Sequence, residues 1–170
     1  MHLSFSPRNK TAAAMVGVLL TIGVAPHVTA QDRYRQIISN DMSKCAPGNG
    51  PAVRVSVTNI KSATGKVRVQ VYRGTKEEWL ETGRWLHRIE LAARQGTMTF
   101  CMPVPEAGTF AIAARHDAND NGKTDITKDG GAMSKNPSIN IFNLGKPNYK
   151  KTRFEVGSGV TSISIRMRYF

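Results

Sequence analysis

Cysteine, histidine and aromatic residues are scarce in this sequence, and their scarcity excludes several kinds of chemistry. Of 170 residues, two are cysteines and four are histidines, and aromatic residues make up 7%. The cysteines form no C-x-x-C motif, which excludes a thiol redox centre of that type. A zinc site needs more histidine or cysteine than this chain offers. Ser158 lies between two glycines, but no nucleophile-elbow motif surrounds it. We therefore expect no catalytic residues and a non-enzymatic function, with hydrolase activity as the alternative.

Carboxylates are absent from the first thirty residues, which have the pattern of a signal peptide. Arg8 and Lys10 form a basic start, and residues 11–25 form an uncharged apolar stretch. Val28-Thr29-Ala30 has the small-x-small form of a cleavage site, so the mature chain is expected to begin at Gln31. A transmembrane anchor is the alternative, but the apolar stretch of about 15 residues is shorter than the roughly 20 that a span needs. The sequence predicts export to the periplasm or the cell exterior, without a transmembrane span in the mature chain.

The remaining chain of about 140 residues is long enough for one domain with a single core. Without Arg8 and Lys10 it holds 22 basic and 12 acidic residues, a net charge of +10. Such a charge attracts anionic surfaces, for example lipid headgroups or acidic polysaccharide. A surface selected for solubility has the same composition. No nucleic-acid-binding motif is present, and an exported chain rarely meets a genome, so nucleic acid is not an expected partner.

Cys45 and Cys101 are expected to form a disulfide, because a single pair of cysteines in an oxidising compartment usually does. Two buried free thiols are the alternative. The bond would attach an N-terminal segment, residues 31–51, to a later strand of the main domain, residues 52–170. Its role would be structural.

Alternation of apolar and polar residues at period two predicts an all-β fold. Valines alternate with polar residues over 53–58 and 66–71, and the turn-rich stretch 59–65 predicts that these two strands are antiparallel neighbours. Five later stretches continue the pattern: residues 88–92, 97–102, 109–115, 151–156 and 160–169. About seven short strands predict a two-sheet antiparallel β-sandwich of immunoglobulin-like or transthyretin-like type.

One segment departs from this alternation and predicts a short helical insert. Thr75 and Glu78 form a capping box, and the helix is expected to reach about Trp85. Trp79 and Leu86 lie seven residues apart and would share a face that covers one end of the sandwich. Gly83 weakens the helix, which would last about two turns.

The stretch from His116 to Asp125 reads H-D-A-N-D-N-G-K-T-D and has the ligand spacing of a calcium loop. Five oxygens would bind the ion: those of the Asp117, Asn119, Asn121 and Asp125 side chains and the Lys123 backbone carbonyl. Residue 128, where an EF-hand has a bidentate Glu, is a lysine, and a strand precedes the loop, so this is not an EF-hand. With two carboxylates the expected Kd is about 0.1 to 1 mM. A metal-free Asx-turn connection explains the same residues, and both hypotheses stay open.

A basic sheet face is the other candidate site. Arg54, Arg68, Arg166 and Arg168 occupy the polar phase of their predicted strands. If those strands are neighbours, the four arginines form one cationic face. Arginine suits bidentate contact with phosphate or carboxylate, so an anionic envelope polymer or a lipid headgroup would be the partner. An ordinary solvated face is the alternative.

Several of these segments together resemble the bacterial secreted family called domain of unknown function 2141. The resemblance covers most of residues 52–169 and rests on the stretches 107–112 and 116–125, on Met133-Ser134-Lys135-Asn136 and on Tyr169 near the end of the last strand. The chain departs from the family pattern at residues 127–131 and in having Met133 where the family has an aromatic residue. The resemblance implies a β-sandwich and carries no activity. We expect an exported, non-enzymatic interaction module, with weak calcium binding or anion binding as its candidate activities.

Overall fold

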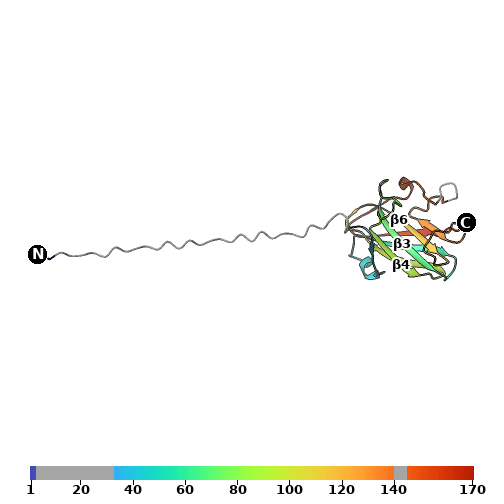
Figure 1. The fold of residues 1–170 in the computed structure, drawn as a ribbon, viewed down its shortest axis with the longest axis horizontal. Helices are drawn as coiled ribbons and strands as arrows, with labels where there is room; N and C mark the ends of the chain where they lie inside the picture. The colour runs from blue at the N-terminus through green and yellow to red at the C-terminus, as the bar shows by residue number, and fades with distance from the viewer. Residues whose placement is uncertain (3–32, 140–144) are drawn as a thin grey trace.

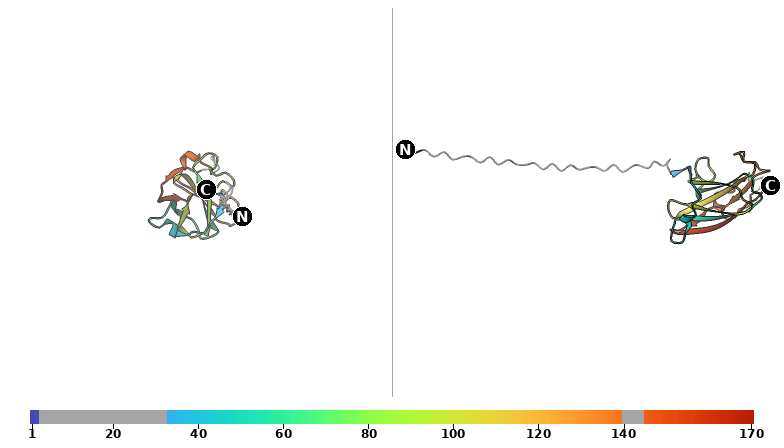
Figure 2. Two further views of the ribbon diagram at one scale, coloured as in Figure 1. Left: turned by 90° about the vertical axis from the view of Figure 1, so that its left-hand side faces the viewer. Right: turned by 90° about the horizontal axis from the view of Figure 1, so that it is seen from below.

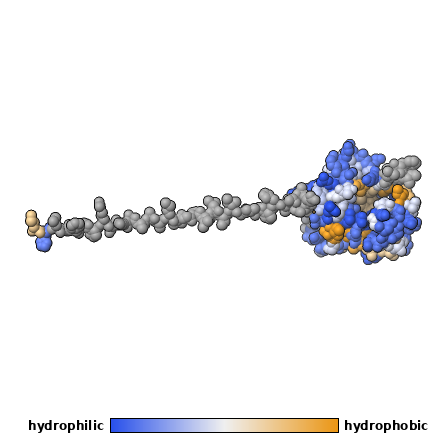
Figure 3. Space-filling view, viewed as in Figure 1, coloured by the Kyte–Doolittle hydropathy of each residue, from blue (hydrophilic) through white to orange (hydrophobic). Residues whose placement is uncertain are grey.

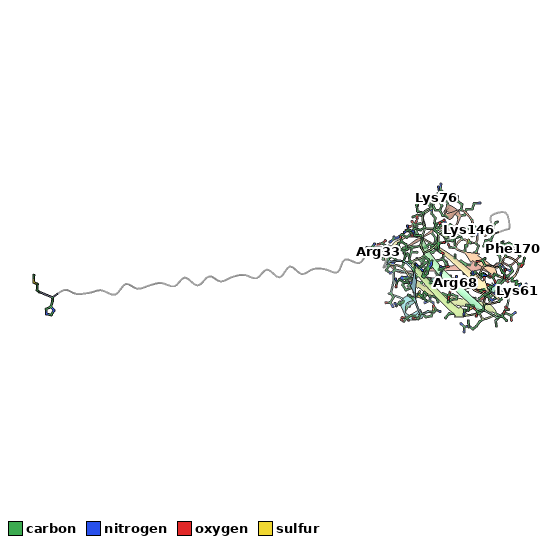
Figure 4. The ribbon with its side chains drawn as sticks, viewed as in Figure 1. Arg33, Lys61, Arg68, Lys76, Lys146 and Phe170 are labelled. Carbon is green, nitrogen blue, oxygen red and sulfur yellow. A yellow bond between two sulfur atoms is a disulfide. The ribbon has the colours of Figure 1, made fainter. Side chains whose placement is uncertain are left out.

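The computed structural model describes residues 1–2, 33–139 and 145–170 (Figure 1). Apart from Met1 and His2, the predicted signal peptide lies outside these ranges. Within them, no helix is long and apolar enough to cross a membrane. Arg33 and Phe170, the first and last residues of the folded part, lie at opposite ends of it (Figure 4).

The described residues form nine strands and two short 3-10 helices. The strands are β1 (Gln36–Ile37), β2 (Ala52–Ile60), β3 (Lys66–Arg73), β4 (His87–Ala92), β5 (Gly96–Pro103), β6 (Gly108–Asp117), β7 (Gly130–Met133), β8 (Phe154–Val156) and β9 (Val160–Arg166). The 3-10 helices are η2 (Met42–Cys45) and η4 (Tyr149–Lys151). The five later strands predicted from the sequence correspond to β4, β5, β6, β8 and β9, whereas the short β1 and β7 were not predicted.

These strands build two sheets that form a sandwich, as predicted (Figure 2). One sheet has six strands in the order β1-β4-β3-β6-β7, with β8 paired to β6, and the other has the order β5-β2-β9. The prediction of purely antiparallel sheets is wrong, because β1 is parallel to β4 and β2 is parallel to β9. Alternation shows which residues face the core but does not show which strand is the neighbour or which way it runs.

The core lies between the two sheets and is filled by the inward-facing alternate residues of both. Val53, Val55 and Val57 of β2 are fully buried, as are Val67, Val69 and Val71 of β3. The prediction that β2 and β3 are paired neighbours is wrong. Residues 61–65 lead the chain from one sheet to the other, so the two valine rows belong to facing sheets. The same alternation serves either arrangement, because in both of them every second residue is apolar.

The helix predicted between Thr75 and Trp85 is absent from the structure. The Trp79 amide donates to the Thr75 carbonyl at 3.1 Å, which makes a single turn. Leu80 and Gly83 then have φ angles of 56° and 75°, outside the right-handed helical region, and the turn cannot continue. Leu86 enters the main core, whereas Trp79 packs on the outer face of the six-stranded sheet, so the two residues do not share a face.

Candidate functional site

The outer face of the six-stranded sheet carries most of the charged and polar side chains that could form a site. Its residues lie in cross-strand rows, because the register fixes which of them are opposite one another. In one row Arg68 of β3 lies between Glu90 of β4 and Arg115 of β6. In the next row Gln70 lies between Arg88 and Ala113. Figure 4 shows Arg68 near the middle of this face.

Two adjoining cavities lie on this face, and we call them together the sheet groove. The first has a volume of about 270 Å³ and is walled mainly by apolar residues, among them Leu80, Ala113, Ile126, Gly131, Met133, Ile139 and Phe170. The second, of about 320 Å³, is lined by polar residues. Arg68 and Arg115 line both cavities and so mark the boundary between them. Figure 3 shows this mainly hydrophilic face, with a hydrophobic patch where Figure 4 labels Phe170.

Small residues on β6 and β7 leave the space in the apolar cavity. Ala113 contributes only a methyl group to its lining, and Gly131 contributes backbone alone. A Cβ built on Gly131 would meet no atom within 4 Å. The neighbouring Gly130 differs, because a Cβ there would lie 2.5 Å from the Tyr169 ring. Gly130 is therefore required by core packing, whereas Gly131 opens onto the groove.

The loop after β6 borders the polar cavity and contains the predicted calcium ligands. Asp117, which is 5% exposed, accepts hydrogen bonds from the Asn121 amide at 3.2 Å and the Gly122 amide at 2.9 Å. The side-chain amides of Asn119 and Asn121 both donate to Asp125 Oδ2, at 3.0 and 3.2 Å. The structure thus brings these four residues together in one hydrogen-bonded loop.

Asp129, which was not predicted as a site residue, closes this loop. Its two carboxylate oxygens accept from the amides of Ala118 at 3.2 Å and Asp125 at 2.9 Å, and the residue is 5% exposed. Lys123, the predicted carbonyl ligand, donates its amide to Asn121 Oδ1 at 2.8 Å. Such Asx-type bonds order a loop without metal.

Among the described residues there is no group of three or more His, Cys, Asp or Glu side chains that could hold a metal. The predicted ligand set has only two carboxylates, so this finding leaves calcium binding a prediction. Arg115 directly affects the predicted calcium binding. Its Nη2 lies 3.0 Å from Asp117 Oδ2, so a guanidinium already neutralises the carboxylate that would be the first calcium ligand.

Arg115 also connects the loop to the sheet groove. Its Nη1 donates to Thr124 Oγ1 at 2.9 Å, and its Nη2 donates to the Gly122 carbonyl at 3.2 Å. Its Nε is buried and has no hydrogen-bond acceptor in the described part of the chain. In the sequence, Arg115 ends a predicted strand in which every second residue, Ala111, Ala113 and Arg115, points to the same side. This alternation was the only indication that the Arg115 side chain lies on the outer face of the sheet.

Arg88 shows how closely cations are packed on this face. Its guanidinium lies over the Trp85 ring, 4.1 Å from the centroid, and 3.8 Å from Glu90. Burial and the nearby charge of Arg68 lower the pKa of Arg88. Arg68 itself donates through Nε to Glu90. Glu90 is therefore the counter-ion of both Arg68 and Arg88.

The four arginines predicted to form one cationic face are divided between the two sheets. Arg54 and Arg166 lie exposed on the outer face of the three-stranded sheet, and the exposed Arg168 lies beyond β9, where it pairs with Gly131. Arg68 belongs to the six-stranded sheet, on the opposite side of the sandwich. The condition for a single face, that these strands are neighbours, does not hold for β3.

The predicted disulfide is present between Cys45 and Cys101. It joins η2 to β5, with a Cα–Cα distance of 5.8 Å. Asn40 supports the same attachment, because its side chain donates to the Thr99 carbonyl at 3.0 Å and accepts from the Cys101 amide at 2.9 Å. The bond lies away from the sheet groove.

Both histidines of the predicted mature chain make structural hydrogen bonds. His116 is fully buried, 2.7 Å from the Tyr169 hydroxyl and 2.8 Å from the Thr64 carbonyl. His87 Nδ1 lies 2.7 Å from the Pro103 carbonyl. Neither histidine lines the sheet groove. His116 faces the core, whereas its neighbour Asp117 lines the polar cavity, so the two side chains lie on opposite faces of β6.

Ser134 and Asn136, in the Met133–Asn136 element of the family resemblance, connect β7 to the rest of the sandwich. Buried Ser134 donates to the Thr152 carbonyl at 2.6 Å and accepts from the Ile112 amide at 3.0 Å. The Asn136 side chain bonds the Ser164 carbonyl and the Arg166 amide of β9. These side chains stabilise the junction between the sheets and leave Met133 to wall the groove.

The fold and its site define a class: a small disulfide-bonded β-sandwich with a hollowed sheet face beside an ordered Asp/Asn loop. The chain belongs to the bacterial family described as "Uncharacterized protein conserved in bacteria (DUF2141)", which matches residues 55–164. The match runs from β2 into β9, and the resemblance noted in the sequence is thereby confirmed. No curated protein and no solved structure matches the chain.

Proposed function

We propose that this protein is an exported, non-catalytic binding module whose ligand site is the sheet groove. The observation that carries the proposal is the apolar cavity of about 270 Å³ on the outer sheet face, which has two arginines at one end. Ligand sites are typically concave and mostly apolar, with a few polar groups that orient the ligand. The size of this cavity suits a small molecule.

The strands give the groove a rigid base. Arg68, Ala113, Arg115 and Gly131 lie within hydrogen-bonded strands, and the register fixes their relative positions. Sites on strands are held more accurately than sites on loops. The residues that wall the groove from above lie outside the strands: Leu80, Ile126 and Ile139 in connecting segments and Phe170 after β9. A fixed floor with walls from loops supports binding of one preferred ligand class.

A non-catalytic role agrees with the positions of the two histidines. His87 and His116 are held by backbone carbonyls and Tyr169, away from the groove.

The disulfide supports export, since such bonds persist in oxidising compartments. The N-terminal basic and apolar pattern supports export through a signal peptide.

A blocking variant tests the groove directly. Gly131→Leu adds a side chain into open space on the groove floor without a backbone clash. The matched control is Gly157→Leu, because a Cβ at Gly157 also meets nothing within 4 Å and this residue lies in the exposed turn before β9. The probe is anilinonaphthalene sulfonate, whose fluorescence rises in apolar sites. We expect the wild type and Gly157→Leu to bind it with one saturable site and Gly131→Leu to lose that site.

The measurement also needs a check on folding. Circular dichroism and urea midpoints should agree among the three proteins, so that lost binding reports a filled groove. Equal dye binding by folded Gly131→Leu and wild-type protein would overturn the proposal.

A second candidate is the binding of anionic envelope polymers or lipid headgroups by the three-stranded sheet. The exposed positions of Arg54 and Arg166 on its outer face favour it. The test is sedimentation with phosphatidylglycerol vesicles at low salt and at about 0.5 M salt, where screening is short-ranged. Binding that is lost in salt and in Arg54→Gln/Arg166→Gln, but kept in Gly131→Leu, would assign it to this face.

Weak calcium binding by the Asp117–Asp125 loop stays part of the proposal. The convergence of Asn119, Asn121 and Asp125 within hydrogen-bond distance supports it. The ion would have to compete with Arg115 for Asp117, which agrees with the low affinity expected from the sequence.

A further inference from the structure

Two arginines face each other on the floor of the sheet groove. Arg68 of β3 and Arg115 of β6 are register partners, and both line both cavities. Like charges directly opposite one another on neighbouring strands destabilise a sheet. Each arginine therefore needs a compensating anion. Glu90 serves Arg68, and Asp117 serves Arg115.

These carboxylates leave part of each guanidinium unused. Glu90 takes only Nε of Arg68, and the two Nη groups of Arg68 have no acceptor in residues 33–139 and 145–170. On Arg115 the situation is reversed. Both Nη groups are bonded, whereas the buried Nε lacks an acceptor within the same ranges. Because Arg115 Nε is closed to solvent, the Nη groups of the partly exposed Arg68 are the donors that a ligand in the groove can reach.

The carboxylates around this position already have donors of their own, Asp120 with Lys66 among them. Arg88 shares Glu90 with Arg68, and burial together with the Arg68 charge lowers the pKa of Arg88. On the other side Asp117 is occupied by Arg115 and by two backbone amides. Asp125 and Asp129, which also line the apolar cavity, accept hydrogen bonds from loop donors. Lys146, on the rim, adds a further cation (Figure 4).

We propose that the groove binds a small amphipathic anion, with its carboxylate or phosphate head between Arg68 and Arg115 and its apolar part in the cavity over Ala113 and Gly131. The inference rests on the proposed function of the groove and names its ligand class. A head group alone would leave the apolar walls unused, and a neutral apolar ligand would leave the arginine donors without an acceptor. Only a molecule with both parts satisfies the two ends of the groove.

The experiment compares four probes that separate head from tail: octanoate, octyl phosphate, octanol and acetate. Binding is measured by titration calorimetry and by amide shifts of β3, β6 and β7. We expect both octyl anions to bind the folded wild-type protein, octanol to bind at least about tenfold more weakly, and acetate not to bind. A hydrogen bond to a charged group contributes about 1.5 to 3 kcal/mol, which corresponds to at least about tenfold in affinity.

Variants assign the head group. Arg68→Gln should weaken octanoate at least about tenfold and leave octanol unchanged, because it removes the Nη donors and keeps the apolar wall. Arg115→Lys keeps the positive charge beside Asp117 and Arg68, so it should weaken octanoate less than Arg68→Gln does, without unfolding the loop. Arg94→Gln is the charge-matched control, since this exposed arginine lies in the β4–β5 turn and outside the groove.

The outcomes distinguish this inference from the proposed function. If octanoate and octanol bind equally, and Gly131→Leu abolishes both, the groove is a ligand site but the anion inference is overturned. If no probe shifts the groove strands, both are overturned. Sedimentation with phosphatidylglycerol vesicles separates a free anion from a lipid surface. Vesicle binding that persists in Arg68→Gln and Gly131→Leu, without binding of soluble octyl anions, would also overturn the inference.

Discussion

His116 and Tyr169 are joined by a 2.7 Å hydrogen bond between the imidazole Nδ1 and the phenol hydroxyl, although they lie 53 residues apart. The rings meet edge to face, with centroids 5.8 Å apart. The Thr64 carbonyl can only accept, so His116 Nε2 donates to it. In that neutral tautomer Nδ1 is the acceptor and the Tyr169 hydroxyl donates to it, while the hydroxyl oxygen accepts from the Lys61 amide at 3.0 Å. One network thus connects β6, the 61–65 crossover and the C-terminal segment.

Tyr169→Phe should destabilise the fold by about 1 to 3 kcal/mol, because the buried His116 Nδ1 loses its donor. The ring stays in place, so the change isolates the hydroxyl. Urea unfolding measures the difference through the midpoint at constant m-value. Tyr149→Phe is the control, since the Tyr149 hydroxyl has no hydrogen-bond partner within the described residues. Equal midpoints for wild type and Tyr169→Phe would show that the network does not contribute to stability.

The same network shows what the sequence could and could not predict. Period-two alternation correctly predicted the strands that carry the valines and β6 as far as Arg115, because burial of one sheet face imposes it. His116, which the sequence assigned to the following loop, still lies within β6. The alternation did not predict that β2 and β3 lie in different sheets. Nor did it predict the parallel β2–β9 pair. Both depend on long-range pairing, which the pattern within one strand does not encode.

The candidate site divides in the same way. The Asp117–Asp125 loop was predicted, because its ligand spacing is local and its turn chemistry is written in consecutive residues. The sheet groove was not, because it needs Gly131 of β7 beside Arg115 of β6 and Arg68 of β3. The helix prediction failed where a local capping signal was outweighed by Leu80 and Gly83, which have positive φ angles, and by packing of Trp79 onto Tyr72.

Removal of the disulfide should reduce stability by about 4 kcal/mol in the chain-entropy estimate, because Cys45 and Cys101 are 56 residues apart. The comparison is wild type against Cys45→Ala/Cys101→Ala in urea, with and without a reducing agent. Reductant should lower the midpoint of the wild type and leave the double variant unchanged. Oxidised wild-type protein should show no titratable thiol when denatured. Two reactive thiols would contradict the bond.

Alkaline pH should destabilise the protein partly through Tyr72. Burial raises the pKa of Tyr72 from 10.0 to about 12. Above pH 10 the unfolded state loses this proton while the folded state keeps it, so the free energy of unfolding falls as pH rises. The loss is about 2 to 3 kcal/mol and is complete above about pH 12. Below pH 10 the proton is bound in both states and there is no effect.

Tyr72→Phe isolates this contribution, because it keeps the ring that packs edge to face on Trp79 at 5.5 Å. The pKa values of Tyr34 and Tyr169 are also raised, and the variant leaves both unchanged. Urea midpoints at about pH 9 and about pH 11.5 should therefore fall less in Tyr72→Phe than in wild type. Parallel declines in the two proteins would mean that Tyr72 ionises in the folded state near its ordinary pKa.

Calcium should raise the melting temperature of chelator-treated protein if the Asp117–Asp125 loop binds it. At about 5 mM, roughly ten times the expected Kd, linkage gives about 1.4 kcal/mol, a shift of a few degrees. Asp117→Ala and Asp125→Asn should each abolish the shift, since they remove the two anionic ligands. Asp120→Ala is the control, because its carboxylate pairs with Lys66 Nζ at 3.0 Å outside the ligand set. Magnesium should shift the melting temperature less, because it releases its waters reluctantly.

The shift with and without calcium must be compared within each variant, because Asp117→Ala also frees Arg115 and lowers the starting stability. No shift up to about 10 mM calcium would leave the hydrogen bonds of the loop as its sole source of order. Asp117 and Asp129 would then act as acceptors for four loop amides, those of Asn121, Gly122, Ala118 and Asp125, and Asp117 also for the Arg115 guanidinium. In that case the Arg115 guanidinium, in place of calcium, would neutralise Asp117, and the loop would hold Arg115 at the edge of the groove.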